Sequence, residues 1–231
     1  MAREIKGVLF DLDGTLIDSA PDLYNCINKV LIDHNKPKVE FSKFRKLVSR
    51  GTQTIIEECF DDHLEDGMLE RLRNQFWRYY SSSLTDKTEF FPGIDIVLDY
   101  LTQGNIPWGI VTNKIEKFAK PIINHFGWDM HAAAIIYGDT LTVSKPDPEP
   151  LLVAAEQLKI EPKNCVYIGD TSTDIVAAKA AKMTNIIVGY GYSDLNLKEL
   201  QQMADHFITK ATFLKVILSQ KISKIRISKR N

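Results

Sequence analysis

The sequence has little cysteine, almost no net charge and no long apolar run. Its three cysteines, Cys26, Cys59 and Cys165, lie far apart and form no Cys-x-x-Cys pair, which excludes a disulfide framework and a cysteine-based zinc site. With 29 basic and 30 acidic residues the formal net charge is -1, so no overall charge attracts nucleic acid or an anionic membrane. No segment approaches the roughly 18 consecutive apolar residues of a membrane span. We expect a cytoplasmic protein that binds neither nucleic acid nor membrane.

An apolar stretch that leads directly into two acids lies near the start of the chain. Of the 231 residues, 44% are hydrophobic, which is enough for a buried core. The run from Ile5 to Phe10 predicts a buried strand, and Asp11 and Asp13 follow it, ahead of a turn at Gly14. Side chains two residues apart leave a strand on the same side, close enough to share one ligand or metal. The simpler alternative is that both acids only form the turn, where aspartate is common.

The region after these acids is helical throughout. Ser19-Ala20-Pro21 predicts the start of a helix, with Ser19 as its cap and proline in the first turn. Apolar residues recur from there at helical spacing, and no strand candidate interrupts them before residue 88. We therefore predict two parts, a core formed by residues 1–18 and 89–231 and an all-helical insertion formed by residues 19–88.

From residue 90 onward the pattern alternates between helix and strand. The predicted strands are apolar throughout, which is typical of a parallel sheet whose two faces are both covered by helices. They comprise residues 108–111, 134–137, 165–168 and 185–188, separated by helical periodicity at about 115–126, 148–159 and 172–182. We predict an α/β fold with a doubly wound parallel sheet, whose ligand site lies outside the carboxyl ends of the strands.

Polar residues collect at that predicted edge of the sheet. They are Asp11, Asp13, Thr112, Asn113, Lys145, Asp170 and Asp174. Clustered carboxylates suit a hard cation, and Mg²⁺ fits because it commonly bridges carboxylates to a phosphate. Taken singly, each residue also has an ordinary role: Thr112 can satisfy a turn, Lys145 can be a surface lysine, and the last two acids can cap a helix. The ordered set, and not any one member, points to a site.

Four short motifs in this order resemble those of the haloacid-dehalogenase-like (HAD) phosphohydrolase superfamily. They are Asp11-x-Asp13-Gly14-Thr15, Val111-Thr112-Asn113, Lys145-Pro146 and Gly169-Asp170-Thr171-x-x-Asp174. The resemblance spans about residues 5–213. It implies a Rossmann-like core with a mobile helical cap inserted after the first motif, in agreement with the helical pattern of residues 19–88.

The resemblance implies a role for each acid. Asp11 is the implied nucleophile, which attacks phosphorus and forms an aspartyl-phosphate. Asp13 is the implied acid for the leaving alcohol and then the base for the hydrolytic water. Mg²⁺ is the implied cofactor, bound by the Asp11 carboxylate, the Asp13 backbone carbonyl and Asp170. Asp174 would lie in or just behind this set of ligands.

The other motif residues are implied to bind phosphate. The Thr112 hydroxyl, the Asn113 amide and Lys145 would hold the phosphoryl oxygens as charge redistributes in the transition state. Asp13 favours phosphoester over carbon–halogen chemistry, because dehalogenases resemble the first motif but lack this second acid. The implied partner is therefore a small-molecule phosphate ester.

At a finer level, three stretches resemble phosphoglycolate phosphatases and, equally, N-acetylmuramic acid 6-phosphate phosphatases. They are residues 18–23, 107–114 and 138–146. We expect 2-phosphoglycolate first, with a sugar phosphate as the alternative. The cap of such enzymes closes over the leaving group and sets specificity. Arg50 and Gly51, between predicted cap helices, are candidate specificity residues, since Arg50 offers a fork for a carboxylate; an exposed arginine at a helix end is the alternative.

Two other functions stay open on the sequence. A β-phosphoglucomutase-like phosphosugar mutase would form the same aspartyl-phosphate but return the phosphoryl group to the sugar. A non-catalytic binding or regulatory module is disfavoured, because all four motifs keep their reactive residues. The expected assembly is a monomer or a homodimer.

Two further expectations concern the end of the chain. Lys182 stands where the family pattern has glycine, which predicts a left-handed backbone at a helix end. The basic stretch from Lys221 to Arg230 is expected to be a frayed terminus.

Overall fold

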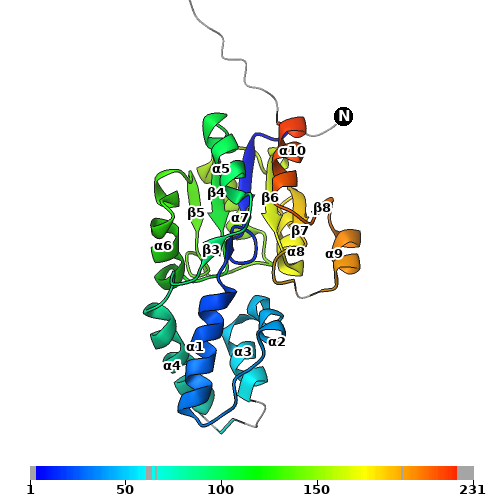
Figure 1. The fold of residues 1–231 in the computed structure, drawn as a ribbon. Coiled ribbons are helices and arrows are strands. Elements are labelled where there is room, and N and C mark those ends of the chain that lie inside the picture. Colours follow the sequence, from blue (N-terminus) through cyan, green and yellow to red (C-terminus); the bar gives the residue numbers. More distant parts are fainter. Residues whose placement is uncertain (1–3, 61–63, 66, 194, 223–231) are drawn as a thin grey trace, which may run out of the picture.

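The core of the protein is a fully parallel, six-stranded sheet. The computed structural model describes residues 4–60, 64–65, 67–193 and 195–222, so most of the basic C-terminal stretch lies outside the described residues. The strand order is β5-β4-β1-β6-β7-β8 (Figure 1). The strands are β1 (Gly7–Phe10), β4 (Trp108–Val111), β5 (Ala134–Ile136), β6 (Cys165–Gly169), β7 (Thr184–Val188) and β8 (His206–Ile208). The predicted doubly wound α/β core is therefore confirmed.

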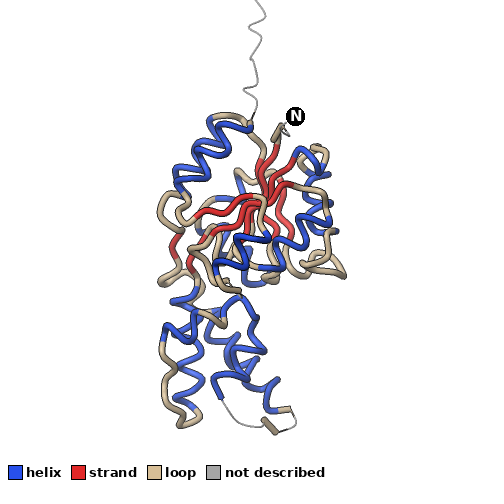
Figure 2. Tube along the Cα trace, turned by 90° about the vertical axis from the view of Figure 1, so that its right-hand side faces the viewer, coloured by secondary structure: helices blue, strands red, loops and turns tan. Residues whose placement is uncertain are grey.

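Both faces of the sheet are buried around its central strands, which is why β1 and β4 are apolar throughout. In β1, Val8 and Phe10 join one apolar cluster and Leu9 joins another on the opposite face. The first cluster includes α5 (Ile94–Gln103), α6 (Glu116–His125) and α10 (Thr212–Lys221), and the second includes α7 (Glu149–Gln157) and α8 (Ser172–Ala180). Figure 2 shows helices on both sides of the strands. Each fully buried aliphatic side chain contributes about 1.5–3 kcal/mol.

A helical cap is inserted between β1 and the rest of the sheet. It consists of α1 (Ala20–Asp33), α2 (Phe41–Arg45), a 3-10 turn η1 (Val48–Arg50), α3 (Gly51–Phe60) and α4 (Met68–Ser81). These helices bury a separate apolar cluster, which Phe118 of α6 joins from the core. Figure 1 shows the cap helices as a unit beyond the end of the sheet from which β1 leads out. The all-helical cap is therefore confirmed, whereas the boundaries at residues 19 and 88 stay a prediction. Within the described residues, no helix has both the length and the apolar character to cross a membrane.

The two segments that join cap and core are tied together. The short strands β2 (Ile17–Asp18) and β3 (Glu89–Phe90) pair antiparallel. The buried Asp22 carboxylate accepts hydrogen bonds from the backbone N–H groups of Lys87 and Thr88 at 3.0 and 2.8 Å. The chain therefore enters and leaves the cap side by side. Two-residue strands carry no usable periodicity, which is why this pairing was not predicted.

Several local features differ from the sequence prediction. Ser19 lies at the N-cap position of α1 but makes no capping bond there, because its hydroxyl donates to the Asp13 carboxylate instead. Strand β8 and the edge helix α9 (Leu197–Met203) were not predicted. The left-handed backbone predicted at Lys182 is confirmed, with φ of 60° directly after α8.

We predict that Lys182→Gly stabilises the protein. A side chain in the left-handed region is strained, and removing the Cβ should raise the free energy of unfolding by about 0.5–1 kcal/mol, net of the added freedom of the unfolded chain. Urea denaturation measures this change. The control Lys179→Gly lies inside α8 and should instead destabilise by about 1 kcal/mol. Equal losses in both variants would contradict the prediction.

Candidate active site

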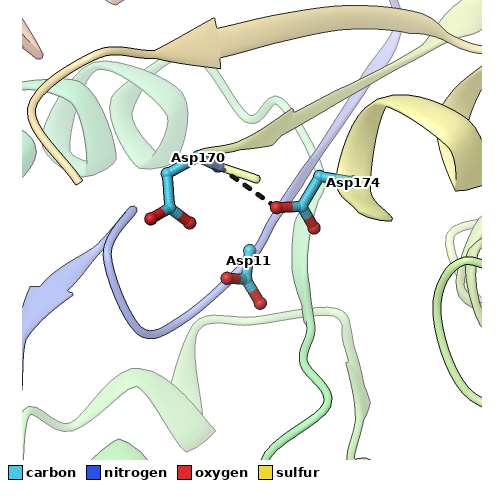
Figure 3. A group of neighbouring side chains, drawn as sticks. All are labelled: Asp11, Asp170 and Asp174. Atoms are coloured by element: carbon cyan, nitrogen blue, oxygen red, sulfur yellow. Dashed lines mark hydrogen bonds between the residues drawn. The ribbon is translucent and has the colours of Figure 1, made fainter. Parts of the chain in front are cut away.

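Three buried carboxylates meet at the carboxyl end of the sheet. Asp11 follows β1, Asp170 follows β6, and Asp174 lies in the first turn of α8. One carboxylate oxygen of each lies within 4.8 Å of the others (Figure 3). Because β1 and β6 are neighbours in register, with Phe10 opposite Ile168, the ends of these two strands bring the acids together.

Glycine at position 14 allows this close approach. The chain after Asp13 turns back past Asp170 with a φ of 86° at Gly14, in the left-handed region. A Cβ at this position would lie 2.2 Å from Asp170 Oδ2, which no side chain can satisfy. Glycine is therefore needed at position 14 both for the turn and for the close packing of the chain against Asp170.

A single buried lysine binds two of the three acids. Lys145 Nζ lies 2.7 Å from Asp11 Oδ1 and 2.8 Å from Asp174 Oδ1. It also donates to the Tyr167 hydroxyl at 2.7 Å, and that hydroxyl donates to the Val111 carbonyl at 2.9 Å. Lys145 is only 5% exposed, so the alternative of a solvated surface lysine does not describe its position.

Asn113 holds the loop that carries this lysine. Its side-chain Nδ2 donates to the Lys145 carbonyl at 2.9 Å, and the Lys145 backbone N–H donates to its Oδ1 at 3.0 Å. The Asn113 side chain is therefore occupied by the protein backbone. Thr112 is buried, and its hydroxyl oxygen accepts the Lys114 backbone N–H at 3.1 Å, which leaves the hydroxyl proton for another acceptor.

The acids differ in their affinity for a proton. Burial raises the pKa of Asp11 to about 7, although Lys145 opposes the change. Burial, followed by repulsion from Asp11 and Asp174, raises the pKa of Asp170 well above its usual range. Burial acts in the same direction on Asp174, but Lys145 and hydrogen bonds from Thr171 outweigh it and lower the pKa of Asp174. Ionising all three acids would therefore place more negative charge in the group than Lys145 compensates.

Asp13 lies outside the group of three acids. Its carboxylate oxygen Oδ1 accepts from Lys114 Nζ at 3.0 Å and from the Ser19 hydroxyl. The side chain of Asp13 is 21% exposed, whereas that of Asp11 is 10% exposed. The two acids of the first motif are thus paired with different lysines, and only the Asp11 carboxylate belongs to the acid group.

The acid group fits a hard divalent cation. Asp11 Oδ1 is bound by Lys145. Asp170 Oδ2 accepts the Tyr192 N–H at 2.6 Å and Asp170 Oδ1 accepts the Thr15 hydroxyl at 3.5 Å, so both carboxylates keep lone pairs for a cation. Asp174 is more heavily engaged, because its Oδ2 accepts from Asp170 N at 3.2 Å and from Thr171 as the helix cap. The donor set favours oxygen-seeking Mg²⁺, with Asp174 behind the ligands and capping α8 at the same time.

A cavity of about 290 Å³ lies between this acid group and the cap. Its core side includes Asp11, Thr112 and Lys145, and its cap side includes Gly51 and Tyr80. Residues of the sequence motifs therefore line a cavity that the core and the cap enclose together.

Arg50 does not belong to the described lining of this cavity. Its guanidinium lies 3.4 Å from Glu58 in an ion pair in which both side chains are nearly half exposed. The structure thus separates the two candidate specificity residues, because Gly51 reaches the cavity and Arg50 pairs on the cap surface.

Some residues of the site were not predicted. Tyr167, Tyr80 and Tyr192 contact the lysines or acids of the motifs, but no role was assigned to them. Tyr167 could have been recognised from the sequence, because its hydroxyl is a polar group within the otherwise apolar run of β6. Lys114 directly follows the second motif, yet only the folded chain shows its contact with Asp13.

Comparison with known proteins identifies the family. The model of the haloacid dehalogenase-like hydrolase family matches residues 8–188. The chain belongs to this family. A phosphoglycolate phosphatase of Xanthomonas campestris pv. campestris (strain 8004) is 40% identical over 187 residues, 81% of this chain and 84% of that protein. An N-acetylmuramic acid 6-phosphate phosphatase of Pseudomonas aeruginosa is 36% identical over 188 residues, 81% of this chain and 83% of that protein.

Solved structures of the family share the whole architecture. The crystal structure of a predicted phosphoglycolate phosphatase from Haemophilus somnus 129pt has a TM-score of 0.82 at 27% identity. The superposition covers 92% of this chain and 98% of the chain in that crystal structure. This HAD-like hydrolase is thus an enzyme of the phosphatase type, with a sheet and cap arranged as in its relatives.

We predict that Asp170→Asn stabilises the metal-free enzyme at neutral pH. The raised pKa of Asp170 means that the folded state keeps a proton that the unfolded state releases above about pH 4, so stability falls as the pH rises. Asparagine has no such proton, and in EDTA the variant should gain on the order of 1 kcal/mol, or about 2–4 °C in Tm, at pH ~7.5.

Thermal unfolding at two pH values tests this effect. The gain should shrink as the pH falls toward about 4, because the unfolded wild-type chain then also keeps a growing share of this proton. Asp99→Asn, which changes an exposed acid on α5 outside the group, should give no pH-dependent gain. A destabilised Asp170→Asn protein at neutral pH would contradict the inference.

Proposed function

We propose that this hydrolase is a Mg²⁺-dependent phosphomonoesterase that works through an aspartyl-phosphate on Asp11. Its proposed substrate is a small phosphorylated metabolite, 2-phosphoglycolate first. The observation that carries the proposal is the buried group of Asp11, Asp170 and Asp174 with Lys145, open to a cavity of about 290 Å³. The 40% identical phosphoglycolate phosphatase supports the choice of substrate.

Asp11 is the proposed nucleophile. Lys145 holds the Asp11 carboxylate through Oδ1 at 2.7 Å, and this carboxylate attacks phosphorus in line as the bond to the leaving oxygen breaks. Mg²⁺, held by Asp11, Asp170 and the Asp13 backbone carbonyl, would favour ionised Asp11 and neutralise phosphoryl charge. The Thr112 hydroxyl donates to a phosphoryl oxygen, and the Lys145 ammonium, whose three donors are held by Asp11, Asp174 and Tyr167, stabilises the phosphoryl charge by its own positive charge.

Asp13 is the proposed proton carrier. It gives a proton to the leaving oxygen as the alcohol departs, and then takes one from the water that attacks phosphorus of the aspartyl-phosphate. That second attack releases inorganic phosphate and restores both aspartates. Asn113, whose side chain holds the Lys145 backbone, is assigned a positioning role in place of a side-chain contact with phosphate.

N-acetylmuramic acid 6-phosphate is the second candidate substrate. A relative named for it is 36% identical to this chain, and a cavity of about 290 Å³ approaches the size of pockets that bind drug-sized ligands, about 300 Å³ and larger. A mutase would instead require a bisphosphate activator and release no phosphate, so one assay separates the two reaction types.

We predict phosphate release from at least one substrate of a defined panel, and its loss in Asp11→Asn. The panel is 2-phosphoglycolate, N-acetylmuramate 6-phosphate, glucose 1-phosphate and pyrophosphate, each with Mg²⁺. Asparagine cannot form the acyl phosphate, so kcat should fall by more than about a thousandfold. Inorganic phosphate is measured directly.

The matched control is Asp139→Asn. Asp139 is an exposed acid at the same edge of the sheet, where it accepts the Glu116 N–H at 2.8 Å, and its variant should keep wild-type kcat. Phosphate release by folded Asp11→Asn at the wild-type rate would refute the nucleophile. Turnover only with a bisphosphate activator would select the mutase.

We also predict that Mg²⁺ binds to the folded enzyme and is required for activity. At about 100 times its Kd the ion should add about 2.7 kcal/mol of stability, or about 5–10 °C in Tm. Asp170→Asn should lose this rise and Asp139→Asn should keep it. Full activity in excess EDTA would show that the acid group does not use a divalent cation.

A further inference from the structure

A second lysine, largely but not fully buried, joins the core to the cap above the acid group. Lys114 follows Asn113 at the end of β4, and its side chain is 11% exposed. Its Nζ lies 3.0 Å from Asp13 Oδ1 and 2.6 Å from the hydroxyl of Tyr80, which is on α4 of the cap. Nζ also lies 4.7 Å from the Tyr80 ring centroid. All three residues line the cavity.

This lysine–tyrosine pair has hydrogen-bond donors left over. Lys114 has three N–H donors and uses two of them, on Asp13 and Tyr80. Tyr80 accepts from Lys114, and its own proton meets no acceptor among the described residues. Ser49, in the same cavity wall, has a buried hydroxyl without a hydrogen-bond partner there. Buried donors without acceptors are costly, so the cavity is suited to a ligand that accepts hydrogen bonds.

The charges around Lys114 and Tyr80 favour the binding of an anionic ligand. Asp11 and Asp13, both from the core, are the only carboxylates in the described lining, and the cap contributes none. The cap wall is instead apolar, with Phe76, Trp77 and Ile55. Burial lowers the pKa of Lys114, but Asp13 and Tyr80 outweigh it and hold that pKa above its usual value. Lys114 therefore remains a cation in a largely apolar space, where an ionic partner binds strongly.

We propose that Lys114 and Tyr80 bind a carboxylate on the leaving group, so that the enzyme prefers phosphate esters of hydroxy acids. The inference rests on the proposed function, because it assigns the substrate class of the same site. Asp13, the proposed proton donor to the leaving oxygen, touches Lys114 directly at 3.0 Å. A carboxylate bound by Lys114 thus lies next to the ester oxygen, which fits a short hydroxy acid.

Two substrates that differ only in this group test the proposal. One is 2-phosphoglycolate, and the other is 2-hydroxyethyl phosphate, in which a CH₂OH group replaces the carboxylate. Wild type should show a higher kcat/KM for the acid. In Lys114→Met the acid-to-alcohol ratio of kcat/KM should fall by at least about thirtyfold, the low end for truncating a desolvated charge pair. The ratio cancels any effect of the variant on Asp13, because that effect is common to both substrates.

Further variants separate recognition from folding. Tyr80→Phe keeps the ring and removes one donor, and should lower the same ratio by about tenfold. Lys117→Met, which changes an exposed lysine three residues further on, should leave the ratio unchanged. Circular dichroism checks that each variant folds, and p-nitrophenyl phosphate reports the chemistry without a carboxylate.

Each result decides the proposal. An equal kcat/KM for both substrates in wild type, or an unchanged ratio in both Lys114→Met and Tyr80→Phe, overturns carboxylate recognition while the phosphatase assignment stands. Hydrolysis of none of these three esters and of no substrate of the panel above overturns the proposed function, and this inference with it. A ratio that falls in both variants but not in Lys117→Met supports the assignment.

Discussion

The buried ammonium of Lys145 is the contact on which the rest of the site depends. A buried charge is tolerated only where paired and fully hydrogen-bonded, and Lys145 uses its three donors on Asp11, Asp174 and Tyr167. Those partners follow β1, open α8 and lie within β6, while Lys145 itself lies in a separate loop held by Asn113. The four segments reach one point only if β1 and β6 keep their register. The pairing of these strands in the sheet therefore also fixes the geometry of the site.

The excess of negative charge at this point gives the site its chemistry. Three carboxylates surround one ammonium, and burial, reinforced by repulsion between the carboxylates, raises the pKa values of Asp11 and Asp170. A divalent cation would relieve that repulsion and restore Asp11 as an anion, which is what a nucleophile needs. The cap completes the arrangement by adding an apolar wall, because charge interactions strengthen where water is excluded.

Much of this architecture could be predicted from the sequence, and the physical reasons are specific. Strands buried on both faces, such as β1 and β4, are apolar at every position, and the edge at which they end follows from their parallel order. The contact of Lys114 with Tyr80 was not predictable, because it joins a strand end to a cap helix and leaves no periodic trace. The same applies to Ser19, whose capping role was a sound local expectation until the fold brought Asp13 within its reach.

The different surroundings of Asp11 and Asp13 follow from where the strand stops. Strand alternation would place both side chains together, but β1 ends at Phe10 and Gly14 turns the chain back, so the period of two does not extend to Asp13. Asp11 remains buried against Lys145, whereas Asp13 is twice as exposed and borders the cavity beside Lys114. A group that exchanges protons with a leaving alcohol and then with water must be reachable from the cavity. A nucleophile must be held still. The turn at Gly14 therefore gives two neighbouring acids the separate environments that their proposed roles require.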